Sequence, residues 1–249
     1  MPNLSKLTVL SAFDLPMKEA IAFLTQKVSR VTWDWNELSA AAQSKAFTVA
    51  KVLQADVLES IRSALEEAQE RGLPFEAFKL SLEPTLKAKG WWGRQSVVNP
   101  KTGVAEAVQL GSPWRLETIY RTNLQAAFQA GRYKQQQATA RRRPYLQYHA
   151  ITDIRTTSVC RALHLKVFPV DDPIWARAYP PNHFNCRARV VSLSGRELQR
   201  LGLAPESGTA FEAWKPEEGF AGSPAEGWEP DVKKYPKEIG EQLSLALRG

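Results

Sequence analysis

Cysteine and histidine are scarce in this chain. Only two cysteines and three histidines occur among its 249 residues. Two cysteines cannot build the multi-disulfide framework that holds many small secreted domains together. No paired-carboxylate motif accompanies the few histidines, which argues against a metal-dependent enzyme.

Long apolar runs are also absent. No segment approaches the roughly 20 consecutive apolar residues that a membrane-spanning helix needs. The first residues hold a single lysine, Lys6, and no long apolar stretch, which is not the pattern of a secretory signal. Hydrophobic residues make up 43% and charged residues 24% of the chain. These values predict a globular protein that assembles in the cytoplasm and has no membrane partner.

Acidic residues are depleted in one part of the chain. Residues 113–200 hold 15 of the 33 Lys and Arg but only 5 of the 26 Asp and Glu, so their net charge is +10. Such a block favours a polyanionic partner, and non-specific double-stranded DNA is the commonest one. A solvated basic face, or a surface that matches an acidic protein, explains the charge equally well.

The densest basic cluster is Arg141, Arg142 and Arg143. With Tyr145, Tyr148 and His149 nearby, it could bind phosphates and stack on bases. The alternative is a charged helix end that complements the helix dipole. No base-reading motif is visible, so no sequence-specific recognition is predicted.

Residues 1–92 are expected to be helical. Asp14 and Pro16 are suited to begin a first helix, and Gly72 is suited to end a long one. Apolar residues at helical spacing predict three helices. They cover residues 17–28, residues 36–71 and a short stretch after Pro74.

Residues 93–201 are expected to form a mixed core domain. The predicted order is a hairpin over residues 96–110, a long basic helix from Pro113 to about Arg141, a strand over residues 145–151, a loop-rich region and a short helix over residues 194–201. Residues 202–249 are rich in Gly and Pro, with spaced aromatic anchors, and predict an extended C-terminal arm. The fold class is therefore α+β, with a helical N-terminal region, a long basic helix, a small mixed α/β core domain and an extended C-terminal arm.

The most specific segment runs from residue 121 to residue 189. It contains an Arg-Thr helix with a later Gly-Arg, an Asp-x-Arg-Thr loop followed by a cysteine, and a Pro-Pro-x-His-x-x-Cys-Arg stretch. The residues concerned are Arg121, Thr122, Gly131, Arg132, Asp153, Arg155, Thr156, Cys160, Pro180, Pro181, His183, Cys186 and Arg187. In this order they resemble the phage Mu F-like head-morphogenesis family. Two positions depart from its pattern: Ala188 stands where a cysteine is common, and His164-Leu165 where a glycine is common.

Cys160, His164, His183 and Cys186 are candidate metal ligands. They form C-x3-H and H-x2-C pairs about twenty residues apart, a spacing similar to that of a structural zinc site. Asp153 is the alternative fourth ligand. The more common explanation of such residues is two buried cysteines and two polar loop histidines. A Cys160–Cys186 disulfide is disfavoured in a reducing cytoplasm and would form only after lysis. Asp153, Arg155 and Arg187 are more easily explained as a loop ion pair than as acid–base machinery.

The family resemblance implies a phage minor capsid protein and no enzymatic activity. Such proteins join the prohead in few copies near the portal protein and the major capsid protein, and some travel with the DNA into the host. The virion is then the final location. A metal-dependent nuclease built on His183 is the alternative. A C-terminal toxin domain is a third option, but the roughly fifty residues after Arg200 are few for an enzyme domain.

Overall fold

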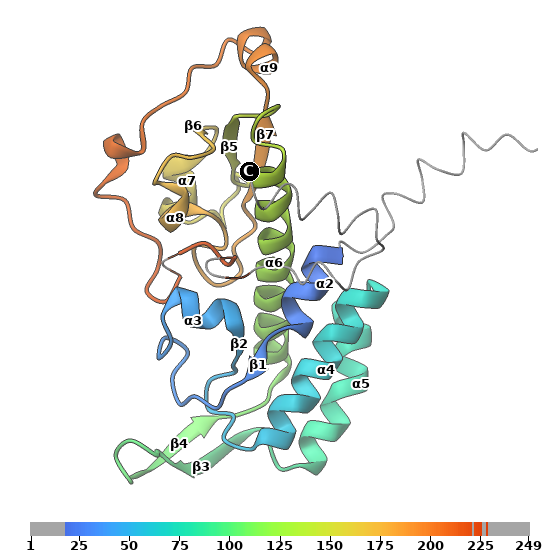
Figure 1. The fold of residues 1–249 in the computed structure, drawn as a ribbon. Coiled ribbons are helices and arrows are strands. Elements are labelled where there is room, and N and C mark those ends of the chain that lie inside the picture. The colour runs from blue at the N-terminus through green and yellow to red at the C-terminus, as the bar shows by residue number, and fades with distance from the viewer. Residues whose placement is uncertain (1–17, 221, 226–227, 229–249) are drawn as a thin grey trace, which may run out of the picture.

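The computed structural model describes residues 18–220, 222–225 and 228. The predicted helix start at Asp14 and Pro16 lies outside the described residues, as do residues 229–249 of the predicted arm. Figure 1 shows a helical lower part and a small sheet-containing upper part, with one long helix, α6 (Pro113–Ala138), passing through both. This agrees with the predicted α+β class.

Three helices pack against α6. They are α2 (Lys18–Thr25), α4 (Ala55–Arg71) and α5 (Phe75–Ala88). Helices α4 and α5 share an apolar core with the first half of α6, which includes Val57, Ile61, Leu65, Phe78, Leu82 and Leu116. Helix α2 packs farther along α6, against Ala127 and Ala130. Gly72 ends α4 in the left-handed conformation, as predicted, with φ at 63°. The helix after Pro74 is longer than predicted and continues past Pro84.

The single helix predicted over residues 36–71 is wrong. The structure instead has a short helix, α3 (Ala40–Lys45), and a short strand, β2 (Ala46–Phe47), before α4 begins. Strand β2 pairs in parallel with β1 (Val28–Ser29). Val28, predicted to lie in the first helix, is therefore in a strand. Lys51 adopts a positive φ of 59° in the turn before α4. That conformation interrupts a helix, although the apolar spacing continues through the turn.

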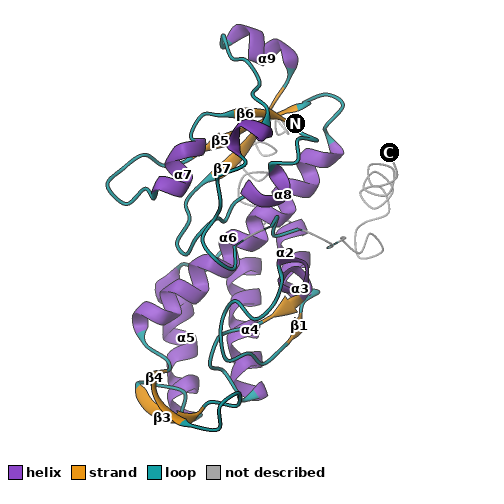
Figure 2. Cartoon of the chain, turned by 90° about the vertical axis from the view of Figure 1, so that its left-hand side faces the viewer, coloured by secondary structure: helices purple, strands orange, loops and turns teal. Residues whose placement is uncertain are grey.

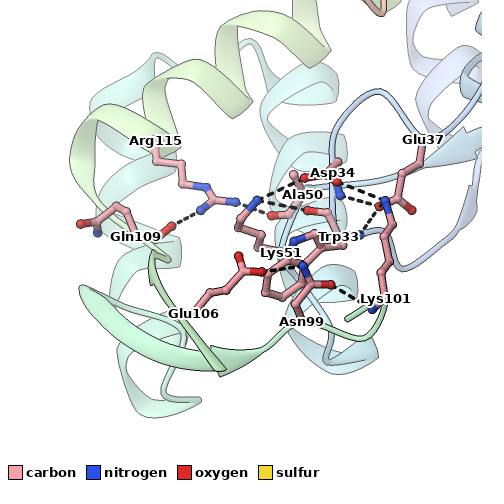
Figure 3. Close-up of polar contacts among 10 residues, drawn as sticks. All are labelled: Trp33, Asp34, Glu37, Ala50, Lys51, Asn99, Lys101, Glu106, Gln109 and Arg115. Atoms are coloured by element: carbon pink, nitrogen blue, oxygen red, sulfur yellow. Dashed lines mark hydrogen bonds and ion pairs between the residues drawn. The ribbon is translucent and has the colours of Figure 1, made fainter. Parts of the chain in front are cut away.

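The predicted hairpin is present as β3 (Arg94–Val98) and β4 (Ala105–Gln109), paired antiparallel. Its turn is fastened to the N-terminal part, because Lys101 forms ion pairs with Asp34 and Glu37 (Figure 3). Arg115, at the start of α6, donates to the carbonyl oxygens of Ala50 and Gln109 (Figure 3). The hairpin is therefore held at both ends.

The upper part contains a three-stranded antiparallel sheet in the order β6-β5-β7. Its strands are β6 (Val167–Pro169), β5 (Tyr145–His149) and β7 (Arg189–Leu193). Short helices surround it: α7 (Ser158–Leu163), α8 (Trp175–Ala178) and α9 (Gly195–Arg200). Figure 2 shows this sheet beside the second half of α6.

Polar side chains of α6 bind the outer edge of β7. Gln125 and Gln129 donate to the carbonyl oxygen of Ala188, at 2.9 and 3.0 Å. Arg132 and Gln136 donate to the carbonyl oxygen of Val190, each at 2.9 Å. An unpaired sheet edge exposes backbone acceptors, and this row of side chains satisfies them while fixing the sheet to the helix.

The described part of the C-terminal arm runs over the upper part and returns toward α2 (Figure 1). Aromatic side chains attach it. Trp214 donates to the carbonyl oxygen of Val159 at 2.9 Å, and Phe211 packs edge-on against Phe168. Trp228 packs edge-on against Phe23, with ring centroids 5.3 Å apart. The arm therefore shares the core of the rest of the chain. The domain boundaries at residues 92 and 201 stay predictions.

Candidate metal centre

Cys160 is placed by α7. The Thr157 side chain caps this helix by accepting from the backbone N–H of Cys160, which is the usual role of threonine at an N-cap. The thiol points into the upper core and is 3% exposed. There it meets the hydroxyl of Tyr148 from β5, at 3.1 Å.

His183 and Cys186 lie on the loop between α8 and β7. The loop follows a cis peptide bond between Pro180 and Pro181, where the sequence left the isomer open. The backbone N–H of Cys186 donates to the carbonyl oxygen of His183, which closes a tight turn. Asn185 has a positive φ of 56° in this turn, a conformation that asparagine tolerates better than most residues.

The loop places His183 and Cys186 beside Cys160, so three side chains of types that can bind a metal lie together. The Cys160 Sγ atom lies 3.1 Å from His183 Nε2 and 3.7 Å from Cys186 Sγ. All three donor atoms lie within 4.8 Å of one another, and all three residues are buried. They form the one group of at least three Cys, His, Asp or Glu found with this geometry among the described residues. Both cysteines are free thiols.

The two thiols differ in acidity. Hydrogen bonding from the Cys160 thiol lowers the pKa of Cys186 to about 7, although burial opposes this. Hydrogen bonding to Cys186 and then burial raise the pKa of Cys160 far above its ordinary value. Burial lowers the pKa of His183, but hydrogen bonds with Cys160 and with the Phe184 carbonyl outweigh burial and raise it. The cluster therefore favours one thiolate, at Cys186.

His164 is not part of the cluster, so its prediction as a ligand is wrong. Its Nδ1 atom accepts from the backbone N–H of Ala150 at 3.2 Å, and its ring faces His149. The cause is the end of α7, since the helix stops at Leu163 and turns His164 away from Cys160. Cys160 and His164 are only four residues apart in the sequence, but their side chains therefore point to different surroundings.

Asp153 is not free to be the fourth ligand either. Its carboxylate receives two hydrogen bonds from the Arg187 guanidinium, at 2.6 and 2.7 Å. It also accepts from the backbone N–H of Arg155, while the Thr156 hydroxyl accepts from the backbone N–H of Asp153. The Arg187 bond is the main reason that the pKa of Asp153 falls far below its usual range. The predicted ion pair is therefore present and organises the loop; the Arg155 side chain itself is exposed.

Comparison with known protein families identifies the family of this chain. The family model described as "Phage Mu protein F like protein" matches residues 59–191, which is more than half of the chain. The chain belongs to this Mu F-like family. The matched region runs from α4 to β7 and includes all three residues of the cluster.

Two Mu F-like relatives are 45% identical to this chain. One, provisionally named capsid assembly protein F, comes from Escherichia phage Mu; the similarity spans 197 residues, 79% of this chain and 45% of that protein. The other, named Mu-like prophage FluMu F protein, comes from Haemophilus influenzae; the similarity spans 173 residues, 70% of this chain and 41% of that protein. The chain thus spans less than half the length of either relative. No solved structure matches.

The other Mu F-like motif residues have structural positions on α6. Arg121 forms an ion pair with Glu117 one turn earlier, at 2.6 Å. Thr122 has a buried hydroxyl with no hydrogen-bond partner among the described residues. Gly131 is buried, beside Ala127 and Ala130, which pack against α2. None of these three residues joins the metal-ligating cluster.

The structure divides the arginine triplet. Arg141 and Arg142 are exposed in the turn after α6. Arg143 instead donates to the carbonyl oxygen of Ser192 at 2.7 Å and forms an ion pair with Glu197 of α9. Tyr148 is fully buried, so the prediction that it stacks on bases is wrong.

A cavity of about 680 Å³ that the sequence did not reveal lies between the first half of α6, the hairpin and the arm. Trp114, Phe184 and Phe220 line it, together with Lys27. Burial lowers the pKa of Lys27 to about 7, and its ammonium group donates to the Gln43 carbonyl oxygen at 2.8 Å. The cavity could not be foreseen because its walls come from stretches scattered along the chain between Phe23 and Pro224. Of the helices that the structure describes, none has the length and apolar composition required of a membrane span.

Proposed function

We propose that this chain acts in assembly of a phage head, as a minor component present in few copies. The observation that carries the proposal is the 45% identity, over 79% of the chain, to the phage Mu protein provisionally named for capsid assembly. The portal protein and the major capsid protein of the prohead are the proposed partners. The protein would act in the host cytoplasm during assembly and remain in the virion.

The architecture supports a role based on binding surfaces. The long helix α6 is fixed to the N-terminal helices by apolar packing and to the sheet by its glutamine and arginine side chains. Large apolar side chains remain exposed on the lower, helical part of the molecule, with Leu80 on α5 71% and Trp114 on α6 70% accessible. Exposed tryptophan is enriched among the residues that dominate binding at protein interfaces. We therefore propose the outer faces of α5 and the start of α6 for contact with the partner proteins.

A second surface is suited to an anionic partner. Arg141 and Arg142 are exposed after α6, and Arg196 and Arg200 are exposed on α9. The ion pair between Arg143 and Glu197 holds these two segments together. Four exposed guanidinium groups at one end of the molecule support weak, non-specific binding of double-stranded DNA during packaging or delivery.

No observation favours the nuclease alternative. The cluster consists of two thiols and one imidazole, and Asp153, the acidic candidate, is engaged by Arg187. The toxin alternative also gains nothing, because the described part of the arm packs onto the remainder of the chain through its aromatic side chains. A structural, non-enzymatic role therefore remains the proposal.

The test is genetic. The gene should be inactivated by an early stop codon in the phage or prophage that carries it, and restored from a plasmid in a matched control. We expect lysates with few infectious particles and with defective or absent filled heads in electron micrographs, and recovery with the plasmid. Normal yields of filled, infectious heads without the gene would overturn the proposal.

A further inference from the structure

We propose that Cys160, His183 and Cys186 bind one zinc ion, which fastens the loop before β7 to α7. The inference concerns the stability of the upper part of the molecule. It does not depend on the proposed role in head assembly, and each can fail without the other.

The distances fit a zinc site. Zinc binds thiolate sulfur at about 2.3 Å and imidazole nitrogen at about 2.0 Å, in a tetrahedral arrangement. Two sulfur ligands are then about 3.7 to 3.8 Å apart by geometry, and the two Sγ atoms here are 3.7 Å apart. The separation of 3.1 Å between Cys160 Sγ and His183 Nε2 must widen by roughly half an ångström to fit the same geometry. A side-chain rotation of the histidine achieves this.

The imidazole is oriented as a metal ligand. His183 Nδ1 lies 2.8 Å from the carbonyl oxygen of Phe184, and since a carbonyl only accepts, Nδ1 carries the proton. The Nε2 atom, which faces Cys160, then has a free lone pair. Metal-binding histidines are commonly fixed in this way by a second hydrogen bond on the opposite ring nitrogen.

In the metal-free cluster the proton stays on Cys160, and a buried hydrogen-bond chain can stabilise this sulfur as a thiolate once a metal ion displaces that proton. The Asn182 side-chain amide donates to the Tyr148 hydroxyl at 2.9 Å, and that hydroxyl lies 3.1 Å from Cys160 Sγ. Because the hydroxyl oxygen already accepts from Asn182, its own proton is available to the sulfur. Asn182 and Tyr148 are both 0% exposed, so this donor is held in place by the core.

Charge balance also favours a dication. Two thiolates and a neutral imidazole carry a charge of −2, which a zinc ion neutralises. Burying a metal site with no net charge in an apolar core costs far less free energy than burying an uncompensated pair of thiolates. The nearby Arg187 directs its two hydrogen bonds to the Asp153 carboxylate and not to the thiols.

The site has an approach from the surface. A cavity of about 420 Å³ is lined by Cys186 and Arg187, with α6 side chains such as Arg121 and Gln125 on its other wall. A metal ion can enter through this opening, and solvent can fill the fourth position of the ion. The three protein ligands join α7 to the loop before β7, so binding adds cross-links from Cys160 to residues that lie 23 and 26 positions later in the chain.

The first test measures metal in the full chain, purified with a thiol reductant and without chelator, after growth with added zinc. We expect about one zinc per chain by elemental analysis. Replacement by Co²⁺ should give sulfur-to-metal charge-transfer absorption. The variant Cys186→Ala should lose zinc at least tenfold in occupancy. The matched control His164→Asn should retain it, because His164 lies outside the cluster.

The second test needs no variant and so does not depend on a variant's folding. Zinc is removed from the wild-type chain by a chelator and then restored, and the melting temperature is recorded in each state. We expect a fall on removal and recovery on addition of zinc alone. The inference is overturned if the reduced, folded chain binds no zinc or melts unchanged with and without it. It is equally overturned if Cys186→Ala binds as much zinc as the wild type.

Discussion

Asp153 and Arg187 are 34 residues apart in sequence and form a two-bond ion pair, with Arg187 Nη1 2.7 Å from Asp153 Oδ2 and Nη2 2.6 Å from Oδ1. One residue lies in the loop after β5 and the other immediately follows Cys186. The ion pair therefore fastens the loop before β7 on its outer side. The Cys160–His183–Cys186 cluster contacts the same loop on its buried side.

Removing this pair should destabilise the protein in a graded way. Asp153→Ala should lower the melting temperature more than Asp153→Asn, since the amide oxygen can still accept from the Arg155 backbone N–H. Arg187→Lys should also lower it, because lysine cannot form two parallel bonds with one carboxylate. Thermal denaturation followed by circular dichroism measures the order, and equal melting temperatures for all three variants and the wild type would contradict it.

The contribution of Asp153 should depend on pH. Its pKa is lowered in the folded state, so the stabilisation is complete above the unfolded value of about 3.9 and is lost as the pH falls further. Denaturant titrations of the wild type and Asp153→Asn should differ most near neutrality and converge in acid. A difference that stays constant down to about pH 2, well below the ordinary aspartate pKa, would refute this assignment.

Gln136 should matter more to stability than Gln129. The Gln136 side chain accepts from the Tyr179 hydroxyl at 2.7 Å, so Gln136→Leu leaves a buried hydroxyl unpaired and should cost about 2 kcal/mol. Gln129→Leu should cost less than about 1 kcal/mol, because Gln125 still donates to the Ala188 carbonyl oxygen. Chemical denaturation measures both. Adding Tyr179→Phe to Gln136→Leu should cost little more, and full additivity would argue against the pairing.

Leu165 should be improved by glycine. Its φ is 64°, a conformation that is unfavourable for residues with a Cβ atom, and its side chain is 50% exposed. Leu165→Gly should raise the free energy of unfolding by about 0.5 kcal/mol, once the greater freedom of glycine in the unfolded state is subtracted. Leu165→Ala, which keeps the strain, should give no gain. A loss of stability in the glycine variant would show that the side-chain packing dominates.

The arginine triplet should separate into two phenotypes. Changing Arg141 and Arg142 to alanine should leave the melting temperature unchanged and lower the slope of log DNA affinity against log salt by about one to two. Arg143→Ala should lower the melting temperature, because it removes the bonds to Ser192 and Glu197. An unchanged salt slope in the double variant, measured with random-sequence duplex DNA, would assign these arginines to a protein partner.

The sequence predicted the elements whose signals are local. Pro113 begins α6, Gly72 ends α4, and an Asn-Pro-x-x-Gly turn joins the hairpin strands. It failed between residues 36 and 54, where alanines spaced four apart imitate a helix, although Phe47 enters the core from strand β2 and Val49 from the loop that follows it. Only the packing of distant segments decides whether these residues form a helix or a strand and loop.

The cluster was predictable in part for the same reason. Three of the four proposed ligands meet, because the Pro-Pro-x-His-x-x-Cys stretch forms its own tight turn. The fourth depended on where α7 ends, and the sequence did not specify that residue. The glycine common in the family after the first cysteine was a usable signal, since Leu165 takes a positive φ there.

The central claim, a low-copy part in head assembly, is tested most directly by quantitative mass spectrometry of purified proheads and virions after chemical cross-linking. The account predicts this protein in both particles, at far lower abundance than the major capsid protein, with cross-links from α5 or the start of α6 to the portal protein. Absence of the protein from proheads and virions alike would contradict it.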